Sequence, residues 1–385
     1  MRISLTAEDA AFRDEVREFI ANALTPELRE AGTRCTGIYN DYPAANAWHR
    51  ILAARGWSVP GWPVEHGGTG WTAIQHYIFD CEMALAGAPR ITPNAIRMVA
   101  PVLLAFGTEE QKARYLPAIR SGDDWWAQGY SEPGSGSDLA SLSCRAVRDG
   151  DDYVINGSKI WTTHAHFSNR IFCLVRTAKL AKPQQGISFL LFDLDLPGIT
   201  IRPILSISGE HELNEIFFED VRVPASSLLG VENDGWTVAK YLLQHERTHG
   251  WAPLMRARLG RMLKRPMASE PSFRRRLAAA EIKLVALEVM EHRLLTGDAG
   301  ALAPSAVPSM LKILGTELRQ QLTELAIELE GPAATALPGA DEALSDFWPG
   351  SDAMAIYLND RAASIYAGTN EVQRNIIAGA LLRAK

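Results

Sequence analysis

The chain has 385 residues, of which 47% are hydrophobic and 22% are charged, and its formal net charge is −6. This length accommodates two or three domains with sizeable cores, and an acidic balance without a long basic run argues against a nucleic-acid-binding protein. No apolar run approaches the ~20 residues that a membrane-spanning helix needs, and the acidic, amphipathic start is not typical of a signal peptide. The four cysteines form no CxxC pair, which favours reduced thiols in a cytoplasmic protein over disulfides or a zinc site.

Residues 1–124 are predicted to form an N-terminal helical domain. Thr6 is a candidate N-cap for a first helix with one apolar face. The residues on that face are Phe12, Val16, Phe19 and Ile20. The further helical patterns are 44–55, 72–86, 94–105 and a segment from Thr108 to Ile119 that opens with a capping-box signature.

Residues 125–228 change to the two-residue period of β-strands. Tyr153-Val154-Ile155 precedes Asn156-Gly157, which predicts a hairpin whose return strand begins at Ile160-Trp161. Further short strands are expected in RIFCLVRT, GISFLLFDL, GITIRPI and NEIFFEDVRVP, each bounded by Gly, Pro or Asn. Short strands at this close spacing predict a small antiparallel barrel or sandwich.

Residues 229–385 return to a helical pattern. Its long segments are 235–264, 272–296, 305–331 and 351–384. Four helices of such length favour an antiparallel four-helix bundle. The fold class is therefore predicted to be α+β, with an N-terminal helical domain, a middle β-barrel and a C-terminal bundle, and this order alone names no function.

The segment GYSEPGSGSD at 129–138 has the composition of a loop that holds a ligand. Gly134 and Gly136 permit backbone conformations and a close approach that a Cβ would block, while Ser131 and Ser137 offer hydrogen bonds to a polar ring edge. The same residue types are also typical of a plain turn between strands. Composition alone favours the turn.

The segment NGSKIWTT at 156–163 reverses that preference. Trp161 offers a flat face to a planar ring and Thr163 offers a hydroxyl to the edge of that ring, although a strand tryptophan usually belongs to the core. No HExxH, Walker loop or GxGxxG pattern is present. The sequence therefore indicates neither a metal nor a Rossmann-bound cofactor.

These two segments, together with IYAGTNEVQRNIIA at 365–378, closely resemble the acyl-CoA dehydrogenases. The first two match the flavin-binding region of that family and the third matches its C-terminal signature. FFEDVRVP and the terminal helices also match, so the resemblance covers nearly the whole chain. It implies FAD as cofactor, an acyl-CoA thioester as substrate, and an electron-transfer flavoprotein or a similar acceptor as partner.

The resemblance also implies site residues. Those implied for flavin binding are Gln128, Tyr130, Ser131, Gly136, Ser137, Trp161, Thr163 and Thr369. Those implied for substrate binding are Ser137, Arg247, Ala367 and Gly368.

The family's usual catalytic base is absent from its usual place. Desaturation of a thioester needs a carboxylate that removes the α-proton and a donor for the enolate-like oxygen. Many members carry this base as the glutamate of a Tyr-Glu-Gly-Thr motif, where this chain has Ala367. Isovaleryl-CoA and some steroid-side-chain dehydrogenases instead carry it immediately before an arginine on the first long helix of the bundle, where this chain has Glu246-Arg247. The Ala367 backbone N–H can still serve as the oxyanion donor.

Helical periodicity supports Glu246 independently of the resemblance. It shares a stripe that should face inward, and the other residues of that stripe are Ala239, Leu242, Leu243 and Gly250. An unpaired carboxylate on such a face is costly and typical of a functional site. The alternative without catalysis is a buried ion pair between Glu246 and an arginine.

Two motifs with which homotetrameric relatives grip the FAD of a neighbouring subunit are missing. The Arg-x-x-Phe-Gly region reads LKRPMASEPSFRRRLAAAEIKL here, and the Gln-x-x-Gly-Gly region reads ELEGPAATALPG. The resemblance therefore implies an α₂β₂ heterotetramer with a homologous second subunit. The alternatives that stay open are a non-catalytic structural subunit and a flavin oxidase or monooxygenase on the same fold.

Overall fold

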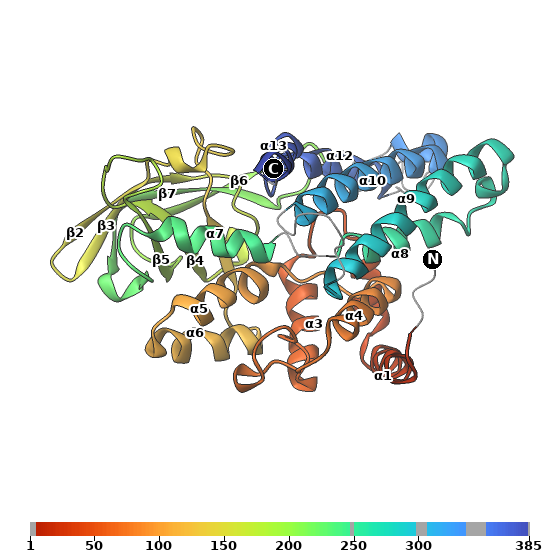
Figure 1. The fold of residues 1–385 in the computed structure, drawn as a ribbon, viewed down its shortest axis with the longest axis horizontal. Helices are drawn as coiled ribbons and strands as arrows, with labels where there is room; N and C mark the ends of the chain where they lie inside the picture. Colours follow the sequence, from red (N-terminus) through yellow and green to blue (C-terminus); the bar gives the residue numbers. More distant parts are fainter. Residues whose placement is uncertain (1–4, 247–249, 298–305, 336–351, 384–385) are drawn as a thin grey trace, which may run out of the picture.

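The computed structural model describes residues 5–246, 250–297, 306–335 and 352–383. Helices form both ends of this chain and one sheet lies between them, so the predicted α+β class is confirmed (Figure 1). The N-terminal helices are α1 Ala7–Ala23, α2 Pro26–Thr33, α3 Tyr42–Arg55, η1 Val64–His66, α4 Ala73–Ala86, the π-helix η2 Asn94–Val99, α5 Ala100–Phe106 and α6 Glu109–Ser121. None of the described helices is both long and apolar enough to cross a membrane.

The predicted helix starts are confirmed at Thr6 and Thr108. The Thr6 side chain accepts a hydrogen bond from the Asp9 N–H, and Thr108 forms the expected capping box with Gln111. The segment expected as one helix over 94–105 is divided, because η2 is a π-helix that changes to an α-helix at α5. Pro101 lies in the first turn of α5 and has no N–H to donate, which favours a wider turn before it.

The middle of the chain forms one eight-stranded sheet with the order β6-β7-β3-β2-β4-β5-β8, in which β1 pairs with β4. The strands are β1 Trp126–Gly129, β2 Arg145–Asp149, β3 Asp152–Lys159, β4 Arg170–Arg176, β5 Ile187–Asp193, β6 Ile199–Ile204, β7 Leu213–Pro224 and β8 Leu228–Leu229. Most pairs are antiparallel as expected, but β4 pairs in parallel with both β1 and β2. Long connections precede β4 and allow it to enter the sheet in the same direction as these two strands.

The hairpin predicted at Asn156-Gly157 is wrong. Both residues lie inside β3, which carries a bulge between Ile155 and Gly157 where it pairs with β7. A Cβ at Gly157 would lie 2.8 Å from the Cys144 Cα, and its φ is +142°, so this glycine permits a close strand approach. The actual hairpin joins β2 to β3 through Gly150, whose φ is +61°. No return strand begins at Trp161.

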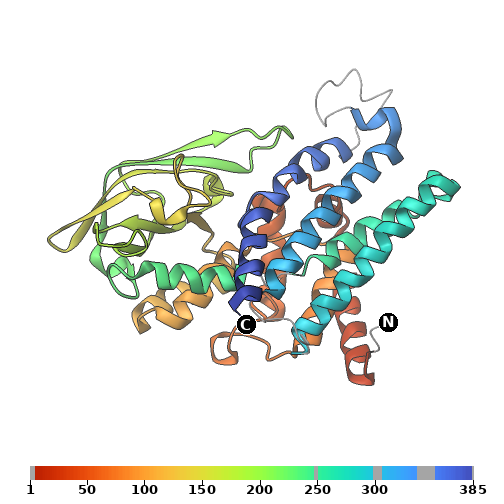
Figure 2. The ribbon, with the colours of Figure 1, turned by 45° about the horizontal axis from the view of Figure 1, so that its top comes forward.

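The C-terminal third is helical as predicted, but two of the four expected segments are divided. Its helices are α7 Gly235–Glu246, α8 Ala252–Met262, α9 Pro271–Leu295, α10 Val307–Glu330, α12 Ala353–Asp360 and α13 Asn370–Arg383. Long helices α9 and α10 run side by side (Figure 2), with α8, α12 and α13 also packed on α10. A buried apolar cluster that includes Leu259, Leu284 and Leu318 joins α8, α9 and α10.

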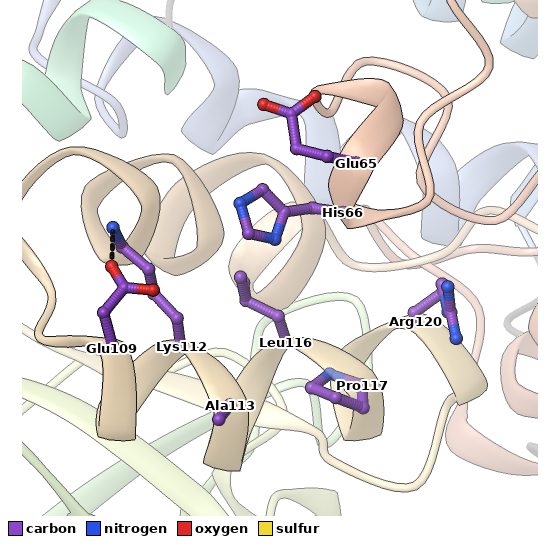
Figure 3. A pocket seen from close by; sticks show the side chains of 8 residues that line it. All are labelled: Glu65, His66, Glu109, Lys112, Ala113, Leu116, Pro117 and Arg120. Carbon is purple, nitrogen blue, oxygen red and sulfur yellow. Dashed lines mark hydrogen bonds and ion pairs between the residues drawn. The ribbon is translucent and has the colours of Figure 1, made fainter.

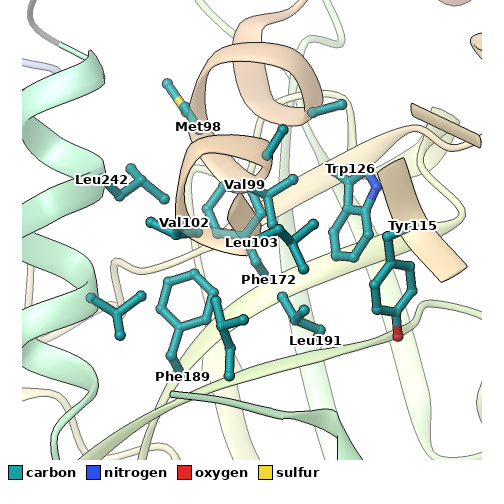
Figure 4. Close-up of a cluster of buried hydrophobic side chains, with 14 of the residues drawn as sticks. Met98, Val99, Val102, Leu103, Tyr115, Trp126, Phe172, Phe189, Leu191 and Leu242 are labelled. Atoms are coloured by element: carbon teal, nitrogen blue, oxygen red, sulfur yellow. The ribbon is translucent and has the colours of Figure 1, made fainter. Parts of the chain in front are cut away.

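Helix α7 lies outside this bundle, against strand β5 and helices η2 and α5. Figure 4 shows Leu242 of α7 beside Met98 of η2, with Phe189 of β5 below them. A Cβ at Gly235 would lie 2.6 Å from the Ser188 carbonyl carbon, so a glycine is needed where α7 begins against β5. Helix α7 therefore runs from the sheet toward the C-terminal helices, in contact with the N-terminal helices along its length.

Candidate active site

A buried ion pair joins the two motif segments of the sheet. The Lys159 Nζ lies 2.8 Å from Glu132 Oε1 and also donates to the Tyr130 carbonyl oxygen at 3.1 Å, and the lysine is fully buried. Glu132 accepts further hydrogen bonds from the Ser143 and Cys144 N–H groups at 2.7 and 2.9 Å. Burial would raise the pKa of Glu132, but Lys159 and these donors hold it below its usual value.

Neither member of this pair was predicted as a site residue from the sequence. Each is an ionisable residue inside a segment of turn and strand residues, and only their side-chain contact shows that they hold the two segments together. The Ile160 N–H adds a backbone hydrogen bond to the Ser131 carbonyl oxygen at 2.9 Å. The loop that begins at Ser131 and the segment that carries Trp161 are therefore one structural unit.

The glycine-rich loop turns tightly between Glu132 and Ser135, which exchange two backbone hydrogen bonds of 2.8 and 2.9 Å. Gly136 and Ser137 are exposed on its outer face. A Cβ at Gly134 or Gly136 would meet no atom of the described chain within 4 Å, so their neighbours in the protein do not require glycine, and the role of both in letting a ligand approach stays a prediction. The space above both glycines is free for a ligand to approach.

A cavity of about 410 Å³ opens beside this loop. It is lined by Glu132, Pro133, Gly134, Ser135, Ser141, Ser143, Gly157, Ser158 and Phe217. The serines supply hydroxyl groups that can donate and accept hydrogen bonds, and the only carboxylate in the lining is already paired with Lys159.

The Trp161 side chain is exposed at the protein surface and does not belong to the core. Its side chain is 57% exposed and its φ is +60°, a left-handed conformation that is uncommon for a bulky residue. Neighbouring Thr162 is held on the sheet by two hydrogen bonds with Asn214, of 2.9 and 3.0 Å, and Thr163 is half-buried. Strained, exposed aromatic residues of this kind cluster at ligand sites, and the arrangement offers a flat face beside a hydroxyl.

The remaining predicted flavin contacts on the sheet differ in position. Gln128 is half-buried on β1. Tyr130 is 6% exposed, and its ring meets the edges of Phe172 and Phe189 in T-shaped contacts, so its side chain belongs to the core. A flavin contact by Tyr130 would therefore have to come from its backbone. The Tyr130 carbonyl oxygen accepts a hydrogen bond from Lys159.

The corner from Tyr366 to Thr369 combines two left-handed residues with a helix start. Ala367 has φ +54° and Gly368 has φ +80°, and the Thr369 hydroxyl accepts from the Val372 N–H at 3.2 Å at the beginning of α13. The Gln373 side chain donates to the Ala367 and Gly368 carbonyl oxygens at 3.4 and 3.1 Å. These bonds fix both carbonyls, and no described residue accepts a hydrogen bond from the Ala367 N–H.

Glu212 links helix α12, which precedes this corner in the chain, to the segment that carries Thr163. Its backbone oxygen accepts from the His164 N–H at 2.9 Å, and its buried carboxylate accepts from Ile38 and Tyr39 of the N-terminal region at 2.7 and 3.1 Å. The same carboxylate accepts from Asn359 of α12 at 3.2 Å. Glu212 therefore connects the N-terminal region, the sheet region and helix α12. This role could not be predicted from local sequence, because its partners are distant along the chain.

Glu246 is the last residue of α7, and its side chain lies outside the described residues, as does all of Arg247. Two members of its predicted stripe, Ala239 and Leu242, are buried in the shared core. Gly250 does not belong to this helix, which ends before it.

A second pocket of about 270 Å³ lies on the N-terminal helices, between η1 and α6. Figure 3 shows Glu65 and His66 above the α6 face, where Glu109 and Lys112 form an exposed ion pair of 2.9 Å. None of the predicted site residues lines this pocket.

Comparisons with known proteins agree on one family. The models of the acyl-CoA dehydrogenase N-terminal, middle and C-terminal domains match residues 6–123, 127–221 and 233–382. Acyl-CoA dehydrogenase IpdE1 of Mycobacterium tuberculosis is 38% identical over 381 residues, which cover 96% of each chain. The chain belongs to the acyl-CoA dehydrogenase family.

Solved structures of this family have the same fold over the whole chain. The Tcur3481-Tcur3483 steroid acyl-CoA dehydrogenase superposes with a TM-score of 0.85 at 31% identity and covers 100% of this chain and 99% of its own. The ChsE4-ChsE5 complex from Mycobacterium tuberculosis gives a TM-score of 0.82 at 33% identity, with coverage of 100% and 99%.

As a member of this family the protein is an FAD-dependent acyl-CoA dehydrogenase. The residues of the site fit this cofactor. Trp161 presents an exposed ring face, Thr163 a hydroxyl, and the loop around Gly136 an open approach to backbone amides.

Proposed function

We propose that Glu246 is the general base that removes the α-proton of the acyl-CoA thioester. The observation that carries this proposal is the corner at 366–369, where the side chain at the usual place of the base is the methyl group of Ala367. Helix α7, which ends at Glu246, has its buried face in the core shared with η2 and β5. Arg247 is proposed to hold the substrate or the base without transferring a proton.

The Ala367 N–H is the proposed donor to the thioester oxygen. Gln373 holds the carbonyls of the two peptides that follow this N–H, so the corner that carries the donor is fixed on its C-terminal side before the substrate binds, and a preorganised donor needs little rearrangement as negative charge develops. When bound, FAD supplies the acceptor for the β-hydride. Trp161 and Thr163 are proposed to position its ring, together with Gln128, Ser131, Gly136, Ser137 and Thr369, and Ser137, Ala367 and Gly368 are proposed to contact the substrate.

Anaerobic mixing of the purified holoenzyme with acyl-CoA thioesters tests this function. We expect substrate to bleach the flavin absorbance, and we expect an electron-transfer flavoprotein or a similar acceptor to restore it. The cytoplasm is the proposed location. Consumption of oxygen without an added acceptor, at the rate of substrate turnover, would instead identify an oxidase.

The protein is proposed to work beside a homologous second subunit in an α₂β₂ assembly. Trp161 and Ile365 are large apolar side chains with exposures of 57% and 64%, and both belong to the motif segments. Their place in the motif segments makes these two exposed side chains available for contact with a ligand or a partner chain. Arg274, Arg275 and Arg276 lie in the region where the Arg-x-x-Phe-Gly motif is missing, and Arg276 is already paired with Glu328 of its own chain.

We expect this chain to bind little FAD when it is produced alone. An FAD pyrophosphate needs matched cationic donors, and this chain has no arginine at the position from which relatives supply one. Production with the homologous neighbour should give a complex with two flavins per four chains, measured by native mass spectrometry and by flavin absorbance. An active homotetramer with four tightly bound FAD molecules would contradict this prediction.

Thr163→Val should shift the flavin spectrum or weaken FAD binding without unfolding the protein. Valine keeps the shape of the half-buried side chain but removes the hydroxyl proposed to meet the ring edge. Absorbance spectra and an FAD titration measure the effect, and Thr200→Val on the exposed side of β6 is the matched control. Equal spectra and affinities for both variants would remove Thr163 from the site.

A further inference from the structure

Helix α10 buries three polar side chains on one face, although the same helix contributes Leu318 and Leu322 to an apolar core. Lys312, Thr316 and Arg319 are only 1%, 0% and 5% exposed, and their spacing of four and three residues places them along one side of the helix. Helix α13 packs on α10 (Figure 2). Buried polar side chains are normally paired, so the partners of these three residues indicate what they hold.

The first two of these residues contact the beginning of α13. The Lys312 Nζ donates a hydrogen bond to Asn370 Oδ1 at 2.9 Å, and the Thr316 hydroxyl lies within hydrogen-bonding distance of the same oxygen, at 3.2 Å. Asn370 is the first residue of α13 and is 4% exposed. Helix α10 therefore holds the C-terminal end of the corner at 366–369.

The third residue, Arg319, contacts the other end of the corner. Its Nη1 donates to the Tyr366 hydroxyl at 3.2 Å, and Tyr366 immediately precedes Ala367. Arg319 is itself fixed, because it shares the buried carboxylate of Asp360 with Arg258 of α8. The corner is therefore fastened to α10 both before and after Ala367.

Ala367 needs such support because of its backbone conformation. Its φ of +54° lies in the left-handed region, which a residue with a Cβ keeps only where the surrounding structure imposes it. Asn370 and Gln373 are three residues apart on α13, so they lie on neighbouring positions of one side. Gln373 donates to the Ala367 and Gly368 carbonyl oxygens. A displacement of Asn370 would therefore move Gln373 and both carbonyls with it.

Lys312 differs from the other two residues because its ammonium group is buried without a carboxylate in ion-pair contact among the described residues. Its hydrogen-bond partner there is the neutral amide oxygen of Asn370. Burial lowers the pKa of Lys312 to about 8, although the exposed Glu371 opposes this effect. Burying a cation without a paired anion costs stability, so folding alone does not favour a lysine here. A buried, perturbed charge beside a proposed reacting centre is typical of a functional role.

We propose that Lys312 is a positioning residue for the reaction, which holds Asn370 and thereby keeps the Ala367 N–H in place as the oxyanion donor. This inference rests on the proposed function, in which Glu246 takes the α-proton and the Ala367 N–H donates to the thioester oxygen. When the α C–H bond breaks, its electron pair forms the enolate and negative charge gathers on that oxygen. A displaced donor then stabilises the enolate less well. Lys312 needs no contact with the substrate itself.

Acetoacetyl-CoA tests the proposal, because its β-carbon is a carbonyl and it therefore has an acidic α-proton but no β-hydride to lose. The protein is the holo complex as it is purified with its partner chain. Charge-transfer absorbance between the bound enolate and the flavin, followed against pH, gives the pKa of the bound α-proton. The wild-type complex should hold this pKa below that of free acetoacetyl-CoA. In Lys312→Met we expect the pKa of the probe to rise by about one unit, a ~10-fold loss of enolate stabilisation, since the donor is displaced and not removed.

Lys312→Met should not lower the stability of the complex in urea. Methionine keeps an apolar stem without the buried charge, and the Thr316 hydroxyl remains beside the Asn370 oxygen. A lysine that serves only the fold would give the opposite pattern, a less stable complex with an unchanged pKa of the probe. The matched control is Lys283→Met, because Lys283 of α9 donates to Gln321 Oε1 of α10 at 2.8 Å in the same kind of bond at the surface. The control should change neither quantity.

Asn370→Ala removes the same link from its other end. We expect it to raise the pKa of the bound probe as Lys312→Met does. The double variant should be no worse than either single variant, because two residues that act through one contact are not additive. Thermal unfolding checks that each variant folds, and Asn370→Ala provides the test if Lys312→Met does not fold.

Three results overturn the proposal. They are an unchanged pKa of the probe in the folded variants, effects of Lys312→Met and Asn370→Ala that add in the double variant, and a wild-type complex that does not lower the pKa of the probe. Failure of the proposed function is a different result, in which acyl-CoA thioesters bind to the wild-type complex and none of them reduces its flavin.

Discussion

Glu246→Gln should leave FAD bound while reduction of the flavin by substrate falls at least ~100-fold. Glutamine keeps the size of the side chain and most of its hydrogen bonding, but it cannot take the α-proton. Ala367 offers no second base at the place where many family members carry one. Stopped-flow absorbance under anaerobic conditions measures the rate of flavin bleaching, and the visible spectrum of the resting protein reports bound FAD.

The matched control is Glu219→Gln, which makes the same chemical change at an exposed position of β7 and should leave the rate unchanged. Near-normal bleaching in Glu246→Gln would show that the base lies elsewhere. That result would favour the alternative in which Glu246 forms only an ion pair with an arginine. The protein should be active with alanine at position 367, so activity should not require Ala367→Glu, which would restore the more common motif.

Lys159→Met should lower the free energy of unfolding by about 3–5 kcal/mol, because it leaves the Glu132 carboxylate buried without its cation. Both side chains are almost completely buried, at 0% and 6% exposure, so water cannot replace the lost partner. Urea denaturation of the complex measures the loss. The exposed pair between Arg50 and Asp123 is the control, since Arg50→Met should change stability by less than about 1 kcal/mol.

The loss in Lys159→Met should also depend on pH in a defined direction. In the wild type, folding lowers the pKa of Glu132. The ionised carboxylate therefore adds to the free energy of unfolding above its unfolded pKa of about 4.3, and this contribution is lost as the pH falls below that value. Without Lys159, burial raises the pKa of the same carboxyl, and protonation then favours the folded state. The stability gap between the two proteins should therefore narrow toward pH 4, and a gap that widened there would contradict this account.

The family motifs and the local signals of the fold could be predicted from the sequence. Capping at Thr6 and Thr108 depends on a side chain and an N–H three residues away, so the residue pattern contains the whole interaction. The apolar stripe of α7 is likewise a matter of spacing along one helix, and Leu242 is buried as that spacing requires. The exposed ring of Trp161, by contrast, contradicts the usual place of a strand tryptophan, and only its motif indicated a binding surface.

Tertiary contacts decided what spacing alone could not. Asn156-Gly157 has the residue pattern of a hairpin turn, but β3 continues through it because Gly157 packs closely against Cys144 of a neighbouring segment. The Glu132–Lys159 pair and the links of Glu212 to three regions join residues that are distant in the sequence, and so does the gathering of arginines around Asp360. The sequence by itself therefore determined the family, the helical and strand regions and the missing glutamate at Ala367. Only the folded chain determined which buried charges lack partners, because that balance depends on every residue that surrounds them in space.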